Sequence, residues 1–276
     1  MNDPIMTRET LTVADARRML GHNTHNRNPR WRNVHRYARD MRDGRWTFTG
    51  DPIRFDAQGV LLDGQCRLLA LVEAGGTSPR VTLDTLVIRG LPAAAQTHMD
   101  LGACRSLADR LRLRGEHDCG LLASTVMLDA SWERTDGYAV GVATHLEALA
   151  WLDAHHDDMV EATRHGRAFA RHGRLLPASC AAVLWVRFAR EDRMMADLFM
   201  RTVANPHGVD AHDPRSLLHD RLAGLRALET QGVDVSTRVK AGLTVKAWNL
   251  WRAGKTCDRL EYRPGGAVGE AFPHVH

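Results

Sequence analysis

The hydrophobic pattern of this chain changes once, near residue 115, and that change restricts the folds open to it more than any other feature. Before it, short runs rich in β-branched and large apolar residues alternate with turn compositions, which is typical of strands. These runs cover 47–50, 52–56, 59–63 and 80–91. After it, apolar residues recur at helical intervals almost throughout. The sequence therefore predicts an α+β fold, with a small mixed-sheet domain at 1–115 and a mostly α-helical domain at 116–276.

Helical patterns also occur within the first domain. Residues 10–20 and 65–74 have the spacing of helices, and a third segment runs from Trp31 to a stop at Gly44. In that third segment apolar residues recur three and four positions apart. The sequence therefore predicts helices in both domains.

Composition and length narrow the class of protein. The chain has 276 residues, of which 44% are hydrophobic and 25% are charged, as in an ordinary globular protein. No apolar run approaches the roughly 20 residues that span a bilayer, and the first residues lack the layout of a signal peptide. We therefore expect a cytoplasmic protein without a membrane partner. Five cysteines without a CxxC pair predict reduced thiols and no structural zinc.

The stretch "LLDGQCRLLAL" joins an apolar run to a helical pattern through a glycine. The first amides of a helix have no internal partner, so a strand that turns through Gly64 into a helix creates an anion pocket. Gly64 allows close approach of the backbone, and Arg67 adds a planar cation suited to phosphate oxygens. We therefore predict phosphate binding by the turn from Gly64 through Gln65 and Cys66 to Arg67.

A second stretch, "MDLGACRSLADRL", repeats the order Gly-x-Cys-Arg at the start of another helical pattern. Gly102, Arg105 and Ser106 would supply the same groups again. Two such pockets facing each other would hold a polyphosphate. We therefore add these three residues to the predicted phosphate site.

Three aspartates lie close in sequence to the glycine turns, namely Asp51, Asp63 and Asp100. A carboxylate there suits a magnesium ion shared with phosphates, or a base that takes a proton from an attacking hydroxyl. The same residues are also common helix caps, so Asp63 and Asp100 have a purely structural alternative. Asp63 is the predicted magnesium ligand, and all three are the predicted catalytic carboxylates.

Together, "GDPIRFD", "LLDGQCRLLAL" and the second stretch resemble the ParB/sulfiredoxin superfamily over roughly residues 25–112. Within it, the chain is similar to a ParB-like family common in actinobacteria and their phages. The resemblance implies a small α/β nucleotide-binding domain in which Arg67 and Arg105 contact phosphates. It also implies that Asp63 lies at a phosphoryl-transfer centre.

The resemblance leaves several functions open. The leading one is a protein that binds ATP or CTP with Mg²⁺ and hydrolyses it or transfers a phosphoryl group. The process would be linked to DNA, such as phage or mobile-element DNA metabolism or modification. A second is a non-catalytic DNA-binding or regulatory protein with a nucleotide switch, and a homo-oligomer remains open for both. A third is sulfiredoxin-like redox chemistry, although Gln65 stands where sulfiredoxins carry the reactive cysteine and Cys66 stands in the histidine position.

Arginines and aromatic residues alternate between residues 27 and 46. The net charge of +4 is compatible with nucleic-acid binding but is too small to predict it. Phosphate contacts and base stacking by this segment would form a nucleic-acid surface. The alternative is a solvated helix face whose aromatic residues, Trp31 and Tyr37, pack inward. The predicted nucleic-acid contacts are Arg27, Arg30, Arg32 and Arg36.

Overall fold

The computed structural model describes residues 3–24, 26, 28–99, 105–264 and 269–276. The chain divides into two compact units, residues 1–104 and 105–276. The predicted boundary after residue 115 lies within the second unit, just after helix α4 (Leu107–Leu113) in the sequence. Leu107 and Leu111 of this helix are buried in the core of the second unit, which explains its place there.

The first unit contains a mixed four-stranded sheet in the order β1-β4-β2-β3. The strands are β1 (Ile5–Leu11), β2 (Ile53–Asp56), β3 (Leu61–Asp63) and β4 (Leu83–Leu91). β1 pairs antiparallel with β4, β4 parallel with β2, and β2 antiparallel with β3. The α+β class and the mixed sheet are therefore confirmed.

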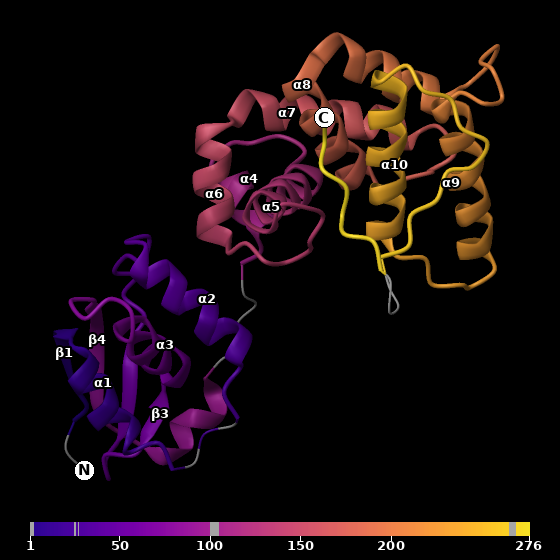
Figure 1. The fold of residues 1–276 in the computed structure, drawn as a ribbon. Coiled ribbons are helices and arrows are strands. Elements are labelled where there is room, and N and C mark those ends of the chain that lie inside the picture. Colours follow the sequence, from indigo (N-terminus) through magenta and orange to yellow (C-terminus); the bar gives the residue numbers. More distant parts are fainter. Residues whose placement is uncertain (1–2, 25, 27, 100–104, 265–268) are drawn as a thin grey trace. The chain divides into compact units, whose positions relative to one another are not determined.

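Three helices cover this sheet: α1 (Val13–Leu20), α2 (Trp31–Arg42) and α3 (Gln65–Gly75). α3 packs against both α1 and α2 (Figure 1). Its residues Leu68 and Leu71 are fully buried against Ile53 and Val87 of the sheet. All three helices were predicted. The core they form holds the β3–α3 turn in place.

One strand prediction was wrong, and one strand was not predicted. Residues 47–50 form no strand, because they have no pairing partner in the sheet. Conversely, β1 was not predicted, although it pairs with β4 along its whole length. Ile5 and Met6 of β1 are 66% and 61% exposed, so the strand lacks the apolar alternation that marks a half-buried strand.

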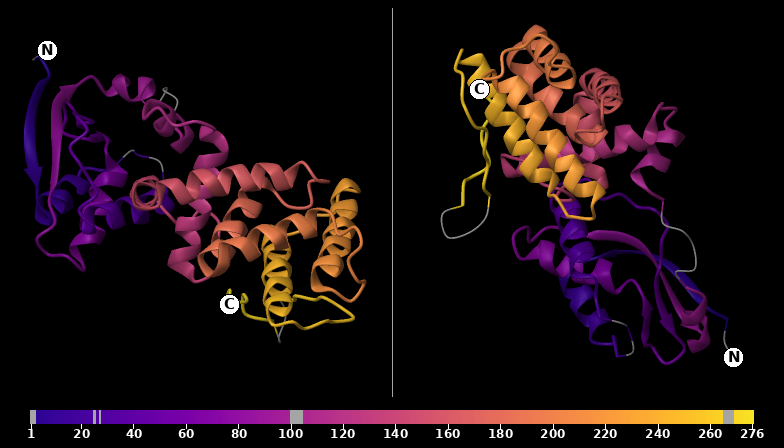
Figure 2. Two further views of the ribbon diagram at one scale, coloured as in Figure 1. Left: turned by 90° about the horizontal axis from the view of Figure 1, so that it is seen from above. Right: turned by 90° about the vertical axis from the view of Figure 1, so that its right-hand side faces the viewer.

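Helices are the regular elements of the second unit in its described residues, as predicted, and the described residues after Gly254 form no helix or strand. Its remaining helices are α5 (Cys119–Thr135), α6 (His145–Ala154), α7 (His156–Ala170), α8 (Ala178–Ala204), α9 (Pro214–Thr230) and α10 (Thr237–Arg252). Figure 2 shows α8, α9 and α10 beside one another. Phe188 stacks on Trp248 with ring centroids 4.3 Å apart. None of the described helices is long and apolar enough to cross a bilayer.

His156 ties the start of α7 to the segment before α5 and makes this part of the second unit sensitive to pH. Its Nε2 lies 3.1 Å from Oε2 of Glu116, and its Nδ1 lies 3.2 Å from Oδ1 of Asp157. The carboxylates of Asp157 and Glu116 raise the pKa of His156 above its ordinary value. The charged form of this imidazole is therefore favoured by folding.

We expect the stability contribution of His156 to be complete below its unfolded pKa of about 6.5 and to disappear as the pH rises through the higher folded value. The His156 side chain is 46% exposed, so solvent screening limits the contribution to about 0.5 kcal/mol. NMR titration of His156 checks the shift. Glu116→Gln should lower its pKa, and an unchanged titration curve in that variant would contradict the ion pair.

Candidate functional site

The turn between β3 and α3 has the form that the sequence predicted. Gly64 precedes the helix in the left-handed conformation, with φ of 102°. Its amide donates a 2.6 Å hydrogen bond to Oδ1 of Asp63. A Cβ at this position would lie 2.3 Å from Cδ1 of Ile53. Backbone conformation and close packing on β2 both require glycine here.

The first amides of α3 differ in whether they have an acceptor. The amides of Arg67 and Leu68 both donate to the carbonyl of Gly64 at 3.0 Å. The amides of Gln65 and Cys66 have no acceptor among the described residues. A helix N-terminus with unpaired amides favours anions. That the amides of Gln65 and Cys66 bind phosphate stays a prediction.

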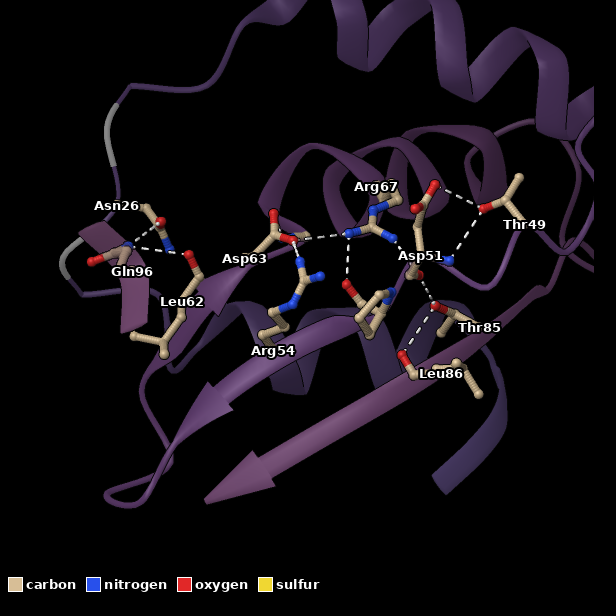
Figure 3. A network of polar contacts seen from close by, with 12 residues as sticks. Asn26, Thr49, Asp51, Arg54, Leu62, Asp63, Arg67, Thr85, Leu86 and Gln96 are labelled. Atoms are coloured by element: carbon tan, nitrogen blue, oxygen red, sulfur yellow. Dashed lines mark hydrogen bonds and ion pairs between the residues drawn. The ribbon is translucent and has the colours of Figure 1, made fainter. Parts of the chain in front are cut away.

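Arg67 lies at the centre of a polar network (Figure 3). Its guanidinium donates to the carbonyls of Asp51 at 2.5 Å and Pro52 at 2.7 Å. Its Nη2 also lies 3.4 Å from Oδ2 of Asp63, and the side chain is only 15% exposed. Arg67 therefore holds the loop before β2 against α3, a role that the sequence did not reveal.

Asp63 is engaged at both carboxylate oxygens. Oδ1 accepts from the Gly64 amide, and Oδ2 accepts from Nη1 of Arg54 and contacts Arg67 (Figure 3). Arg54 was not predicted as a site residue. It lies opposite Asp63 in the β2–β3 register, so a basic residue inside the short run "PIRFD" was the available signal. Two guanidinium groups thus converge on one carboxylate beside the helix N-terminus.

Asp51 is exposed and turns its carboxylate to the Thr49 hydroxyl, which donates to it at 2.9 Å. Its backbone carbonyl accepts from Arg67 and, at 3.1 Å, from the Thr85 hydroxyl. No contact joins the carboxylates of Asp51 and Asp63 in the described residues. The same residues contain no group of three or more His, Cys, Asp or Glu side chains that could hold a metal ion. Asp51 and Asp63 therefore form no metal site on their own.

The second predicted turn is described only in part. Asp100 and Gly102 lie outside the described residues, whereas Arg105 is exposed and Ser106 precedes α4. The Ser106 hydroxyl accepts from the Asp109 amide at 3.2 Å, and the Ser106 amide donates to Oδ2 of Asp109 at 3.0 Å. Ser106 therefore caps α4. That Arg105 completes a phosphate pocket stays a prediction.

The arginine-rich segment forms α2, and its aromatic residues differ in orientation. Tyr37 packs edge to face on Trp46 with centroids 5.1 Å apart, as the inward alternative predicted. Trp31 is 54% exposed, so the inward prediction was wrong for this residue. Helical side chains lean toward the N-terminus, so the first residue of a helix projects past its end. The predicted contacts Arg30 and Arg32 are exposed and Arg36 is half-buried, whereas Arg27 lies outside the described residues.

The similarity of the chain to known proteins is limited. No protein-family model matches it, and no curated protein matches its sequence. A solved structure of a Pnob8-like ParB-N domain matches with a probability of 0.98, covering 88% of this chain and 91% of that one. The two are 13% identical with a TM-score of 0.21. The match has the ParB name that the sequence resemblance predicted, but a TM-score this low carries no argument about function.

Proposed function

We propose that the first unit binds a nucleoside triphosphate or diphosphate at the N-terminus of α3. The observation that carries the proposal is the pair of unpaired amides at Gln65 and Cys66 beside two guanidinium groups. Backbone amides at a helix N-terminus, a close-approach glycine and arginine are the groups that proteins use to bind phosphate. The sequence resemblance to nucleotide-binding ParB-like proteins supports the same ligand class.

Asp63 sets a condition on how phosphate binds. Its carboxylate is the anion that Arg54 and Arg67 contact. A phosphate oxygen would compete with Asp63 for these guanidinium groups, because both are acceptors for the same N–H donors. Arg54 has a side chain that is 31% exposed, compared with 15% for Arg67. Arg54 is therefore the cation more accessible to an incoming phosphate.

Magnesium enters the proposal with the nucleotide. The described residues offer no group of three protein ligands for a metal ion. A magnesium ion at this site would therefore take most of its ligands from phosphate oxygens and water, and at most one from a carboxylate of the protein. Asp63 is the carboxylate nearest in sequence to the free amides, but both of its oxygens already have donors. The residues present therefore do not hold magnesium alone, and we assign no step to the ion.

The process that uses the nucleotide would be linked to DNA, by hydrolysis or phosphoryl transfer. The alternative is a regulatory protein in which the nucleotide acts as a switch. Incubation with γ-labelled nucleotide and analysis of the products separates them. Released phosphate or a labelled acceptor supports turnover, whereas binding without product supports the switch.

Arg67→Ala should weaken nucleotide binding by roughly 10- to 150-fold, because a hydrogen bond to a charged group contributes about 1.5–3 kcal/mol. Calorimetry with ATP, CTP, GTP and their diphosphates, with and without magnesium, measures this. Cys66→Ala is the matched control, since it removes the neighbouring side chain and keeps the amide. The proposal fails if no nucleotide binds, or if a folded Arg67→Ala protein binds as tightly as the wild type.

The redox alternative can be tested separately at Cys66. This residue is half-buried and packs partly against the core of the first unit. Burial raises the pKa of Cys180 to about 12, so that thiol serves as an unreactive internal reference. A rate of electrophile labelling at Cys66 no faster than that of a free thiol would end the redox alternative.

A further inference from the structure

One face of α2 combines an exposed tryptophan with arginines. Trp31 is 54% exposed and stacks on His35, with ring centroids 6.0 Å apart and planes 27° from parallel. The core side of the helix is a different strip, formed by Val34, Ala38 and Met41. Trp31 therefore contributes little to the core, although it is the largest side chain type available to a helix.

The exposed face is continuous. At 100° per residue, six residues of α2 lie within about 140° of the helix circumference, with Trp31 at one edge of this arc and Arg36 at the other. They are Trp31, Arg42, His35, Arg39, Arg32 and Arg36. We call this set the α2 basic face. Arg32 and Arg42 are exposed, and Arg36 and Arg39 are half-buried.

Three acidic side chains on or beside α2 have partners among the described residues. Asp40, the acidic residue of α2, is only 4% exposed and lies 3.3 Å from Nε of Arg45. Glu73 of α3 pairs with Nδ1 of His35 at 2.8 Å. Asp43 pairs with Nη2 of Arg45 at 2.6 Å. The face thus combines several arginines, of which Arg32 and Arg42 are exposed, with one exposed aromatic ring.

We propose that the α2 basic face binds single-stranded nucleic acid. Arginines attract the phosphate backbone, and an exposed aromatic ring stacks on a base whose face is free. In a duplex the base faces are covered by their neighbours, so the tryptophan favours the single strand. Trp31 stacks on a base at the start of α2, while Arg32 and Arg42 contact phosphates of the strand as it runs along the helix. This surface is separate from the N-terminus of α3, so the proposal stands without nucleotide binding.

Fluorescence anisotropy with a labelled 20-nucleotide single strand tests the proposal, with the matching duplex in parallel. Trp31→Ala should weaken single-strand binding by roughly 5- to 150-fold, because stacking contributes about 1–3 kcal/mol per base. Trp31→Phe should retain most of the affinity. Arg42→Gln should reduce the slope of log K against log salt by about 0.7, the value for one phosphate contact on a single strand.

Phe48→Ala is the matched control. Phe48 is a 41% exposed aromatic residue of the same unit that contacts Arg8 and lies outside α2. Its removal should leave the affinity unchanged. The proposal is overturned by an absence of salt-sensitive binding, by unchanged affinity in a folded Trp31→Ala protein, or by an equal loss in Phe48→Ala. Tighter binding to the duplex, or to phosphatidylserine vesicles, that does not depend on Trp31 would also overturn it.

Discussion

Replacing Asp129 by alanine should lower the free energy of unfolding by about 3–5 kcal/mol, the usual result of removing one partner from a buried ion pair. Asp129 is fully buried in α5. Its Oδ1 accepts from Nε of Arg187 at 2.6 Å. Its Oδ2 accepts from Nη2 of Arg190 at 3.1 Å and from the indole of Trp151 at 2.9 Å. One carboxylate therefore joins α5, α6 and α8.

The cost arises from what remains after the substitution. The Arg187 side chain is only 12% exposed, and without Asp129 its charge would be left in the interior with fewer acceptors. Glu133→Ala is the matched control, because Glu133 also pairs with Arg187, at 2.8 Å, but is 52% exposed. We expect that control to cost less than about 1 kcal/mol. Urea unfolding measures both, and equal losses would contradict a dominant role for the buried carboxylate.

The fold class was predictable because it depends on local patterns. Helical spacing marked α2 and α3, short apolar runs between turn compositions marked β2 and β3, and a β-branched run marked β4. β1 was missed because its partner β4 is about 80 residues away in sequence and the strand lies at an exposed edge of the sheet. An exposed edge strand has no buried side to leave a pattern in the sequence. The strand β1 is therefore defined by its pairing with β4, which the local sequence does not indicate.

The same distinction applies to the site. The turn at Gly64 was predictable, because glycine, helix start and Arg67 are neighbours in the chain. The contacts of Arg67 with the carbonyls of Asp51 and Pro52 span 16 and 15 residues, and they depend on how the loop before β2 folds back. Arg54 meets Asp63 only through the β2–β3 register. Sequence thus indicated the phosphate-binding backbone but not the ion pairs that surround it.

Gly64→Ala should destabilise the first unit by about 3 kcal/mol, through two separable effects. The first is backbone strain, because a residue with a Cβ at φ of 102° costs on the order of 1–2 kcal/mol. The second is overlap, because the new methyl group would lie 2.3 Å from Cδ1 of Ile53 and 3.3 Å from its Cα. Overpacking of this kind costs about 1–3 kcal/mol. Thermal or urea unfolding measures the sum.

Gly59→Ala separates the two effects. Gly59 has a φ of 82°, and a Cβ there would meet nothing within 4 Å, so only backbone strain applies. Ile53→Val removes Cδ1, and on its own it should cost about 0.5–1.5 kcal/mol. In the Gly64→Ala background it should instead restore part of the lost stability. Strictly additive costs in this double-mutant cycle would contradict the overlap. Because the Gln65 and Cys66 amides follow directly, Gly64→Ala should also weaken nucleotide binding, whereas Gly59→Ala should leave it intact.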